Sequence, residues 1–270
     1  MLENPMRHIL LVLAALILGV STAQAKVVGK EVTYTANGVT MKGYLAYDKD
    51  IKAKRPGILV VHEWWGHNQF ARKRALLLAG MGYTALAVDM YGNGKTADHP
   101  DDAGKFAAEV SKNMPVAKAR FEAAMKLLAK QPTVAPGQIA AIGYCFGGGV
   151  VLNMARAGED LKGVASFHGV LATDSPAQKG KVKAKIAVFT GEDDPMVPKE
   201  QIRAFTKEMD DAGVDFRLTS YPGAKHSFTN PDADQYAKKF NLPVAYNAEA
   251  DQDSWKKLGE FLDSLFGPRP

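Results

Sequence analysis

The chain has 270 residues, of which 46% are apolar, and it carries 34 basic against 29 acidic side chains, a formal net charge of +5 at pH 7. This apolar content is ample for a buried core. The charges are scattered, with no basic block beyond short pairs, so the composition argues against a nucleic-acid-binding protein.

The N-terminus has the pattern of a secretory signal. Residues 1–7 are weakly basic, residues 9–20 are an apolar run, and residues 21–25 are small and contain an Ala-x-Ala motif. So short a run favours a cleaved signal over a permanent anchor, because spanning a bilayer takes about 20 apolar residues. We therefore predict a signal peptide over residues 1–25, a single domain over residues 26–270, and export, with the periplasm as the compartment.

Two segments that alternate apolar and polar residues follow, at 31–36 and 39–46, on either side of Asn37-Gly38. Asn-Gly between such segments predicts a β-hairpin. The polar stretch 48–55 then predicts a surface loop.

From residue 58 onward, short continuous apolar runs alternate with stretches that have apolar residues at helical spacing. The runs predict buried parallel strands at residues 58–61, 84–88, 139–143, 163–167, 186–190 and 216–220. The other stretches predict helices at residues 69–81, 103–112, 116–130, 150–156, 199–212 and 248–266. The alternation predicts an α/β fold with a doubly wound, mostly parallel sheet and an antiparallel N-terminal hairpin.

The only cysteine, Cys145, lies where an apolar strand meets a glycine-rich turn that opens a helix. Gly-x-Cys-x-Gly is the pattern of a nucleophile elbow with sulfur in place of oxygen. Gly143 and Gly147 remove the Cβ atoms that would clash in so tight a turn. A lone cysteine is otherwise most often a small buried apolar residue, but this setting favours an exposed nucleophile.

A thiol attacks as the thiolate, so Cys145 needs a base, usually a histidine oriented by a carboxylate. In an open parallel sheet, such residues gather beyond the carboxyl ends of the strands. His226, in the loop after the last predicted strand, is the first candidate for the base, and His168 is the second. Three acidic residues stand together after the strand 186–190, and spacing alone does not choose the acid among residues 192–194.

Residues 143–148, 191–198 and 226–228 together resemble the dienelactone hydrolase family. The resemblance extends to residues 62–66 and 82–91 and covers nearly all of the predicted mature chain. It implies an α/β-hydrolase fold and a cofactor-free hydrolase of carboxylic esters or lactones.

The α/β-hydrolase order of nucleophile, acid and histidine, together with this resemblance, selects Cys145, Asp194 and His226 as the triad. We expect the oxyanion hole to be formed by the backbone N–H groups of Trp64 and Phe146.

Glu63 matches a glutamate that in this family contacts the cysteine and moves when substrate binds. A carboxylate beside a thiol disfavours a second negative charge, so the thiol would stay protonated until substrate arrives. We therefore expect Glu63 to act as an activating residue.

Family members that act on chloroaromatic breakdown products hold the substrate carboxylate with two arginines, where this chain has Asn93 and Asn230. A neutral amide cannot replace a bidentate guanidinium. We expect a substrate that depends less on a carboxylate, in a pocket with aromatic walls that include Trp64, although some of these aromatics could simply pack in the core. The other expected pocket residues are Trp65, Tyr91, Asn93, Tyr144, His168, Phe228 and Asn230.

The predicted function is hydrolysis of a small-molecule ester or lactone through an acyl-cysteine intermediate. No nucleic acid, stable membrane anchor, metal or cofactor is expected, and the sequence has no metal-ligand spacing. Two alternatives stay open: a thioester or peptide hydrolase on the same scaffold, and a non-catalytic protein that binds a small molecule or uses Cys145 as a redox thiol. The sequence does not fix the oligomeric state.

Overall fold

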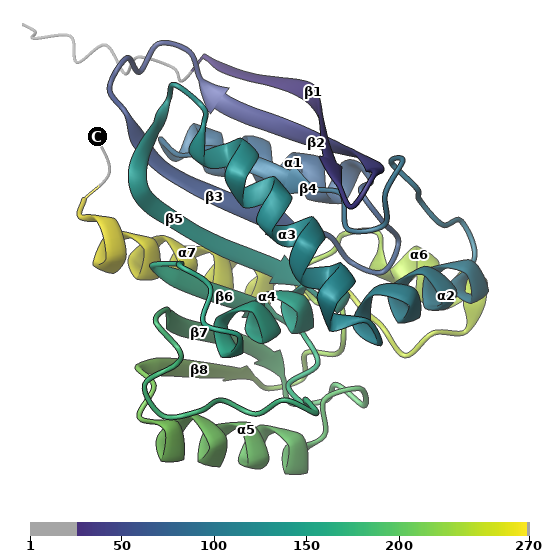
Figure 1. The fold of residues 1–270 in the computed structure, drawn as a ribbon. Coiled ribbons are helices and arrows are strands. Elements are labelled where there is room, and N and C mark those ends of the chain that lie inside the picture. The colour runs from purple at the N-terminus through teal and green to yellow at the C-terminus, as the bar shows by residue number, and fades with distance from the viewer. Residues whose placement is uncertain (1–25, 269–270) are drawn as a thin grey trace, which may run out of the picture.

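A computed structural model describes residues 26–268, and the predicted signal peptide lies outside them (Figure 1). Eight strands form one sheet in the order β1-β2-β4-β3-β5-β6-β7-β8. The strands are β1 (Val27–Ala36), β2 (Val39–Asp48), β3 (Arg55–Val61), β4 (Thr84–Val88), β5 (Val134–Tyr144), β6 (Gly163–Phe167), β7 (Lys185–Gly191) and β8 (Phe216–Tyr221).

The sheet is antiparallel at one edge and parallel elsewhere, as predicted. β1 and β2 form the hairpin, and β2 also pairs antiparallel with β4. The turn places Asn37 at φ 48° and Gly38 at φ 78°, the two positive values that a tight hairpin turn requires. From β4 to β8 in space, all neighbouring strands are parallel. The six predicted parallel strands are confirmed.

Helices cover both faces of this sheet (Figure 1). Buried residues of α1 and α7 pack on one face, and those of α3, α4 and α5 pack on the other. Because both faces are covered, successive side chains of a central strand are all buried, which explains the continuous apolar runs. The helices are α1 (Gln69–Gly80), α2 (Pro100–Ser111), α3 (Met114–Ala129), α4 (Phe146–Arg156), α5 (Lys199–Ala212), α6 (Ala233–Phe240) and α7 (Ala248–Phe266).

α6 was not predicted, and it lies near α2 beyond the carboxyl ends of the parallel strands (Figure 1). Aromatic side chains join the two helices to the loop after β3: Trp65 stacks on Tyr236, with ring centroids 4.4 Å apart, and Phe106 and Phe240 belong to the same cluster. Only Ala233 of α6 is buried, although residues 233, 236, 237 and 240 are apolar or aromatic and follow helical spacing, so the sequence did carry a signal for this short helix.

The predicted loop over residues 48–55 begins one residue too early, because Asp48 is still in β2, and ends one residue too late. Arg55 is already in β3 and is buried, because its guanidinium donates to the carbonyl oxygens of Asp48 (2.8 Å) and Ile51 (2.6 Å). Pro56 follows at an irregularity in the pairing with β5, where a missing N–H is tolerated.

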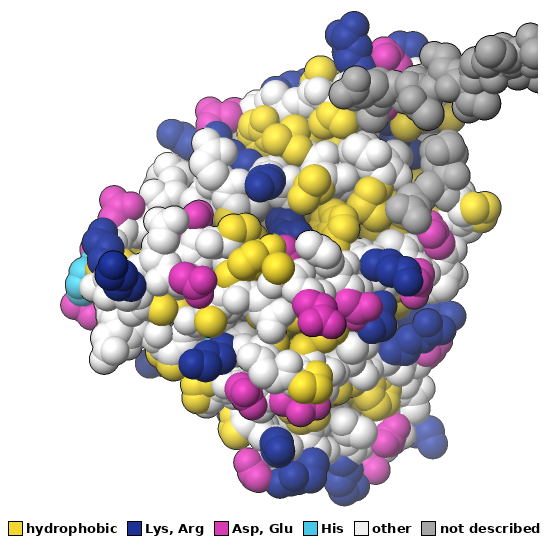
Figure 2. All heavy atoms as spheres, turned by 180° about the vertical axis from the view of Figure 1, so that it is seen from behind, with side chains coloured by type: hydrophobic (Ala, Val, Ile, Leu, Met, Phe, Trp, Pro, Cys, Tyr) yellow, Lys and Arg dark blue, Asp and Glu magenta, His cyan; other side chains and the backbone are white. Residues whose placement is uncertain are grey.

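Acidic and basic side chains are interspersed on the face shown in Figure 2. No helix within residues 26–268 combines the length and apolar character needed to cross a membrane. In the same part of the chain, no three His, Cys, Asp or Glu side chains are grouped so that they could hold a metal ion.

Candidate active site

Cys145 stands between β5 and α4 in a strained backbone conformation, φ 52° and ψ −116°. Such a conformation costs about 1–3 kcal/mol and persists only when its surroundings enforce it. Glycine is required on both sides. A Cβ on Gly143 would meet the carbonyl of Gly147, and a Cβ on Gly147 would lie 2.6 Å from the carbonyl oxygen of His62. The sequence therefore builds the predicted elbow.

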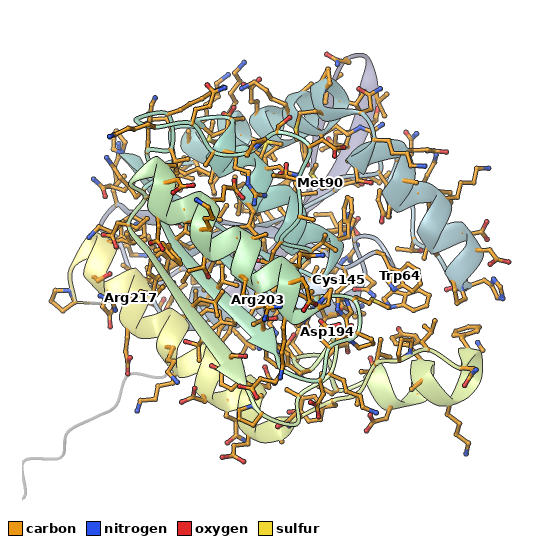
Figure 3. All side chains as sticks on the ribbon, turned by 90° about the horizontal axis from the view of Figure 1, so that it is seen from below. Trp64, Met90, Cys145, Asp194, Arg203 and Arg217 are labelled. Atoms are coloured by element: carbon orange, nitrogen blue, oxygen red, sulfur yellow. The ribbon has the colours of Figure 1, made fainter. Side chains whose placement is uncertain are left out.

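His226 and Asp194 meet at the same end of the sheet, from the loops after β8 and β7. The imidazole Nδ1 lies 2.8 Å from Asp194 Oδ2 and donates to it, while Asp194 Oδ1 accepts from the Met196 N–H at 2.8 Å. Both side chains are buried. Figure 3 shows Asp194 close to Cys145, with Trp64 nearby. The carboxylate thus fixes the tautomer and orientation of the imidazole.

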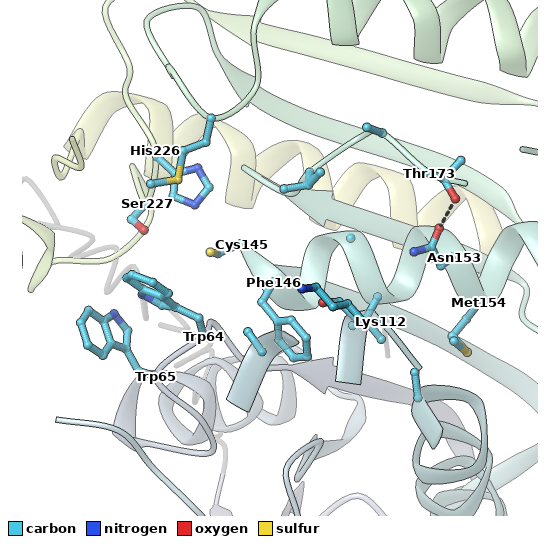
Figure 4. Close-up of a pocket in the computed structure, with 18 of the residues that line it drawn as sticks. Trp64, Trp65, Lys112, Cys145, Phe146, Asn153, Met154, Thr173, His226 and Ser227 are labelled. Carbon is cyan, nitrogen blue, oxygen red and sulfur yellow. Dashed lines mark hydrogen bonds between the residues drawn. The ribbon is translucent and has the colours of Figure 1, made fainter. Parts of the chain in front are cut away.

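The second imidazole nitrogen, Nε2, has no hydrogen-bond partner within residues 26–268. His226 and Cys145 both line one pocket, and Figure 4 shows them facing it together. Burial lowers the pKa of His226, but the negative charge of the Cys145 thiolate and the hydrogen bond with Asp194 outweigh it and leave the pKa raised. The surroundings therefore favour the protonated form of His226.

His168, the second candidate for the base, is occupied elsewhere. Its Nδ1 accepts from the backbone N–H of Cys145 at 3.1 Å, and its Nε2 donates to Thr229 Oγ1 at 2.8 Å. Burial holds its pKa well below the usual value. His168 is a neutral support of the elbow.

Glu63 is buried beside this group, and both of its carboxylate oxygens are occupied. Ser227 Oγ donates to Oε1 at 3.0 Å, and Asn230 Nδ2 donates to Oε2 at 2.6 Å. Burial raises the pKa of Glu63, and these two hydrogen bonds oppose the shift. Among the described residues Glu63 makes no hydrogen bond with Cys145, so the expected contact with the thiol is replaced by contacts with the loop after β8.

The two backbone N–H groups expected in the oxyanion hole are both unpaired. In the described part of the chain, neither Trp64 N–H nor Phe146 N–H donates to an acceptor, and both residues line the pocket. The Tyr91 hydroxyl donates to the Trp64 carbonyl at 2.9 Å and so holds this loop in place.

The pocket has a volume of about 580 Å³ and is partly aromatic, with walls from Trp64, Trp65, Phe146 and Tyr236 (Figure 4). Exposed apolar side chains of Val170 and Met196 also line it. The predicted pocket positions of Trp64 and Trp65 match this lining.

Six other residues predicted for the pocket do not line it, namely Tyr91, Asn93, Tyr144, His168, Phe228 and Asn230. Tyr91 packs beneath Trp64, and Asn93 is an exposed turn residue at φ 59°. Tyr144 and Phe228 are buried with the core on the α1 and α7 side of the sheet. Tyr144 precedes Cys145, and successive strand residues point to opposite faces.

Several residues of this region were not predicted. Ser227 donates to Glu63, and Arg74 supports the loop after β8. Arg74 is buried and donates to the Thr229 carbonyl and to Asp251, both at 2.6 Å. No local pattern marks Arg74.

Lys112 and Asn153, which line the pocket, were also missed. The pocket position of Asn153 could have been predicted, because Asn153 lies eight residues after Cys145 and therefore on the same side of α4.

Residues 41–266 of the chain match the model of the dienelactone hydrolase family. The chain belongs to this family. It is therefore a hydrolase of the esterase type with an α/β-hydrolase fold, which confirms the expected family and enzyme class.

Relatives include Protein usf of Aquifex pyrophilus, 30% identical over 82% of this chain and 98% of that protein. A putative carboxymethylenebutenolidase of Aquifex aeolicus (strain VF5) is 30% identical over 75% of this chain and 87% of its own. Among solved structures, the dienelactone hydrolase-like promiscuous phosphotriesterase P91 from metagenomic libraries has 32% identity and a TM-score of 0.84, covering 90% of this chain and 100% of that one.

Proposed function

We propose that this dienelactone hydrolase family member hydrolyses small-molecule carboxylic esters or lactones with Cys145 as nucleophile. The observation that carries the proposal is the convergence, on one pocket, of an elbow cysteine, a histidine paired with Asp194, and two unpaired backbone N–H groups. These are the parts that acyl transfer requires.

The reaction begins when His226 takes the thiol proton and the Cys145 sulfur attacks the carbonyl carbon. The carbonyl oxygen becomes an oxyanion between the N–H groups of Trp64 and Phe146, and the adjacent donors stabilise it. The intermediate collapses to a thioester on Cys145, and the leaving alkoxide takes the proton from His226. Water then gives a proton to His226, attacks the thioester carbonyl and releases the acid, and the proton returns to the sulfur.

Glu63 supplies a second carboxylate near His226. Its charge interacts with that of the imidazolium, and Ser227 and Asn230 hold both of its oxygens away from the sulfur. In this arrangement the thiol faces His226 directly. We propose that Glu63 stabilises the imidazolium formed during attack.

The test is turnover of activated aryl esters by purified protein. Cys145→Ala should lower kcat/KM by on the order of 10⁴-fold or more, as removal of a triad nucleophile does in hydrolases. Asp194→Asn should lower kcat with little change in KM, because it leaves the pocket intact. If Cys145→Ala retains full turnover, the proposal fails.

Phosphotriester hydrolysis is a second candidate activity, favoured by the 32% identity and the TM-score of 0.84 to the promiscuous phosphotriesterase P91. The same thiolate could displace an aryl alkoxide from phosphorus. Parallel assays of an aryl ester, a thioester, a peptide and an aryl phosphotriester, each read against Cys145→Ala, decide between these substrate classes.

We further propose that residues 1–25 direct export to the periplasm. The support is the apolar run followed by an Ala-x-Ala motif. The full chain should be found in the periplasmic fraction and shortened by about 25 residues in intact mass, whereas a chain that begins at Lys26 should stay in the cytoplasm. An uncleaved full chain in the cytoplasm would contradict this.

A further inference from the structure

The pocket has a polar end, distant from His226, that the proposed reaction does not use. Its lining there includes Lys112, Asn153, Thr173 and Asp174. Figure 4 shows Asn153 and Thr173 across the cavity from His226, with Lys112 near Phe146. A pocket that served only a small acyl group would not need this extension.

The amide of Asn153 is fixed in one orientation. Its Oδ1 accepts from Arg156 Nη1 at 3.1 Å and from Thr173 Oγ1 at 3.0 Å. An arginine only donates, so the atom facing it must be the oxygen. Arg156 is itself buried and held by both carboxylate oxygens of Glu208, at 2.8 and 2.9 Å, and by the Leu171 carbonyl.

This network leaves the Asn153 NH₂ group without an acceptor in residues 26–268. Figure 4 shows its nitrogen directed into the cavity. A donor oriented by a buried arginine and aimed at an open pocket is a preorganised binding group, because little rotamer freedom is lost when a ligand arrives.

The distance from the nucleophile to this donor follows from helix geometry. Cys145, Gly149 and Asn153 are four residues apart along α4 and lie on the same side of it. A rise of about 1.5 Å per residue separates Cys145 from Asn153 by roughly 12 Å. Gly149 lines the pocket between them and has no side chain, so the groove stays open; a Cβ there would come no closer than 3.4 Å to Val170 O.

Lys112 brings a positive charge to the same region. Its side chain is exposed at the end of α2, and it forms no ion pair with any described residue. The lysine ammonium and the asparagine NH₂ group can only donate hydrogen bonds. Together they suit an anionic group that accepts them. Asp174, an exposed carboxylate in the lining, opposes this charge.

We propose that Lys112 and Asn153 form a carboxylate subsite, so that the substrate is an elongated ester or lactone with a carboxylate about 12 Å from the scissile carbonyl. The proposal rests on the proposed hydrolytic function. It also places carboxylate recognition away from Asn93 and Asn230, neither of which lines the pocket.

The experiment compares two matched series of aryl esters of increasing chain length. The chain ends in a carboxylate in one series and in a methyl group in the other. Each series is made twice, with the chain on the acyl side or on the alcohol side of the ester. The measured quantity is the selectivity ratio, which is kcat/KM for the carboxylate-terminated ester divided by kcat/KM for the methyl-terminated ester of the same length. We expect this ratio to exceed about 10 only for chains long enough to reach Asn153, as for a hydrogen bond to a charged group. Selectivity in either the acyl or the alcohol arm supports the subsite.

Four variants separate the subsite from general effects. Asn153→Asp keeps the oxygen that Arg156 and Thr173 require and replaces the donor by a carboxylate, so it should lower the ratio by about tenfold or more. Lys112→Met should lower it, and Asp174→Asn should raise it. Lys105→Met, an exposed lysine of α2 that does not line the pocket, should leave it unchanged.

The subsite would be overturned by a ratio near one at every chain length on both the acyl and the alcohol side. If Cys145 still hydrolyses the methyl-terminated esters, the proposed hydrolytic function is not affected by that result. A ratio that Asn153→Asp and Lys112→Met leave unchanged would also overturn the subsite. Loss of Cys145-dependent turnover on every ester would instead contradict the proposed function itself.

Discussion

At the scale of the residue, one buried histidine of the site differs from the others in the direction of its pKa shift. Three buried histidines are held neutral: burial lowers the pKa of His62 to about 4, that of His67 to about 3, and that of His168 well below its usual value. His226 is equally buried, yet its pKa is raised because the Cys145 thiolate and Asp194 stabilise its charge. The environment therefore singles out His226 as the group that holds the proton.

Removing this imidazole should change the rate of thiol alkylation and its pH profile. In His226→Gln, Cys145 loses the side chain that takes its proton, so alkylation by iodoacetamide near neutral pH should be slower than in the unaltered protein. The control is His99→Gln, a surface position outside the pocket. If the pH profile of Cys145 alkylation is unaltered in His226→Gln, His226 does not activate the thiol.

Glu63 offers a second prediction at this scale. Glu63→Gln keeps the size of the side chain, removes its negative charge near the imidazolium, and leaves one acceptor oxygen in place of the two that now accept from Ser227 and Asn230. We expect kcat to fall by about tenfold with little change in KM, since about 1.4 kcal/mol corresponds to one power of ten. Steady-state kinetics over a range of pH check this, and a change confined to KM would assign Glu63 to substrate binding instead.

Cys145 and His226 could be proposed from local sequence and chain order, whereas the choice of Asp194 among residues 192–194 needed the family resemblance. The pocket residues could not be predicted in this way. Whether an aromatic side chain lines a cavity or packs in the core depends on which face of the strand it occupies and on what covers that face. Tyr144 and Trp65 show the two outcomes: Tyr144 faces the core, and Trp65 lines the cavity.

At the scale of the element, α4 connects Cys145 to the far end of the pocket in one helix. Its first residues pack against backbone: a Cβ on Gly147 would lie 2.6 Å from the carbonyl oxygen of His62, with the Val61 carbonyl closer still. A Cβ on Gly148 would likewise lie 2.8 Å from Gly169 Cα, whereas a Cβ on Gly149 would make only an ordinary contact, 3.4 Å from Val170 O. The same helix thus has two glycines that the fold requires and one that it does not.

This difference predicts opposite effects of the same substitution. Gly147→Ala should destabilise the protein by several kcal/mol, because overpacking against backbone cannot be relieved by a rotamer change. Gly149→Ala should be neutral or stabilising by up to about 1 kcal/mol, since alanine is the better helix former. Urea unfolding of both variants checks this, and equal stability of the two would contradict the packing argument.

Strands and most helices could be predicted at this scale because burial on one or both sides leaves a clear pattern of apolar residues in the sequence. The parallel strands β4 and β6 and the helices α5 and α7 have the predicted bounds. α6 was missed although residues 233, 236, 237 and 240 follow helical spacing, because a helix of eight residues has only about two turns in which a period can show. Its aromatic contacts with Trp65 and with α2 could not be predicted from that spacing.

At the scale of the whole molecule, buried neutral histidines couple stability to pH. For His62, His67 and His168 the pKa is lower in the folded than in the unfolded state, so below about pH 6.5 the unfolded chain binds more protons. Each group then lowers the free energy of unfolding by up to about 1.4 kcal/mol per pH unit as pH falls. The raised pKa of Glu63 acts in the opposite sense and offsets part of this.

We therefore expect the free energy of unfolding to decrease as pH falls from about 6.5 towards 4. Urea unfolding at several pH values in that range measures it. His67→Gln removes one of the three groups, at a position outside the pocket, and should make the dependence less steep. Stability that stays constant or rises on acidification would contradict the assignment of these histidines as neutral.

The central claim is that Cys145 carries the acyl group, and rapid-quench intact-mass analysis during turnover of an aryl ester tests it most directly. The account predicts a transient mass increase equal to the acyl group, mapped by peptide analysis to Cys145 and absent in Cys145→Ala. Continued turnover by Cys145→Ala, or an acyl group mapped to another side chain, would contradict it.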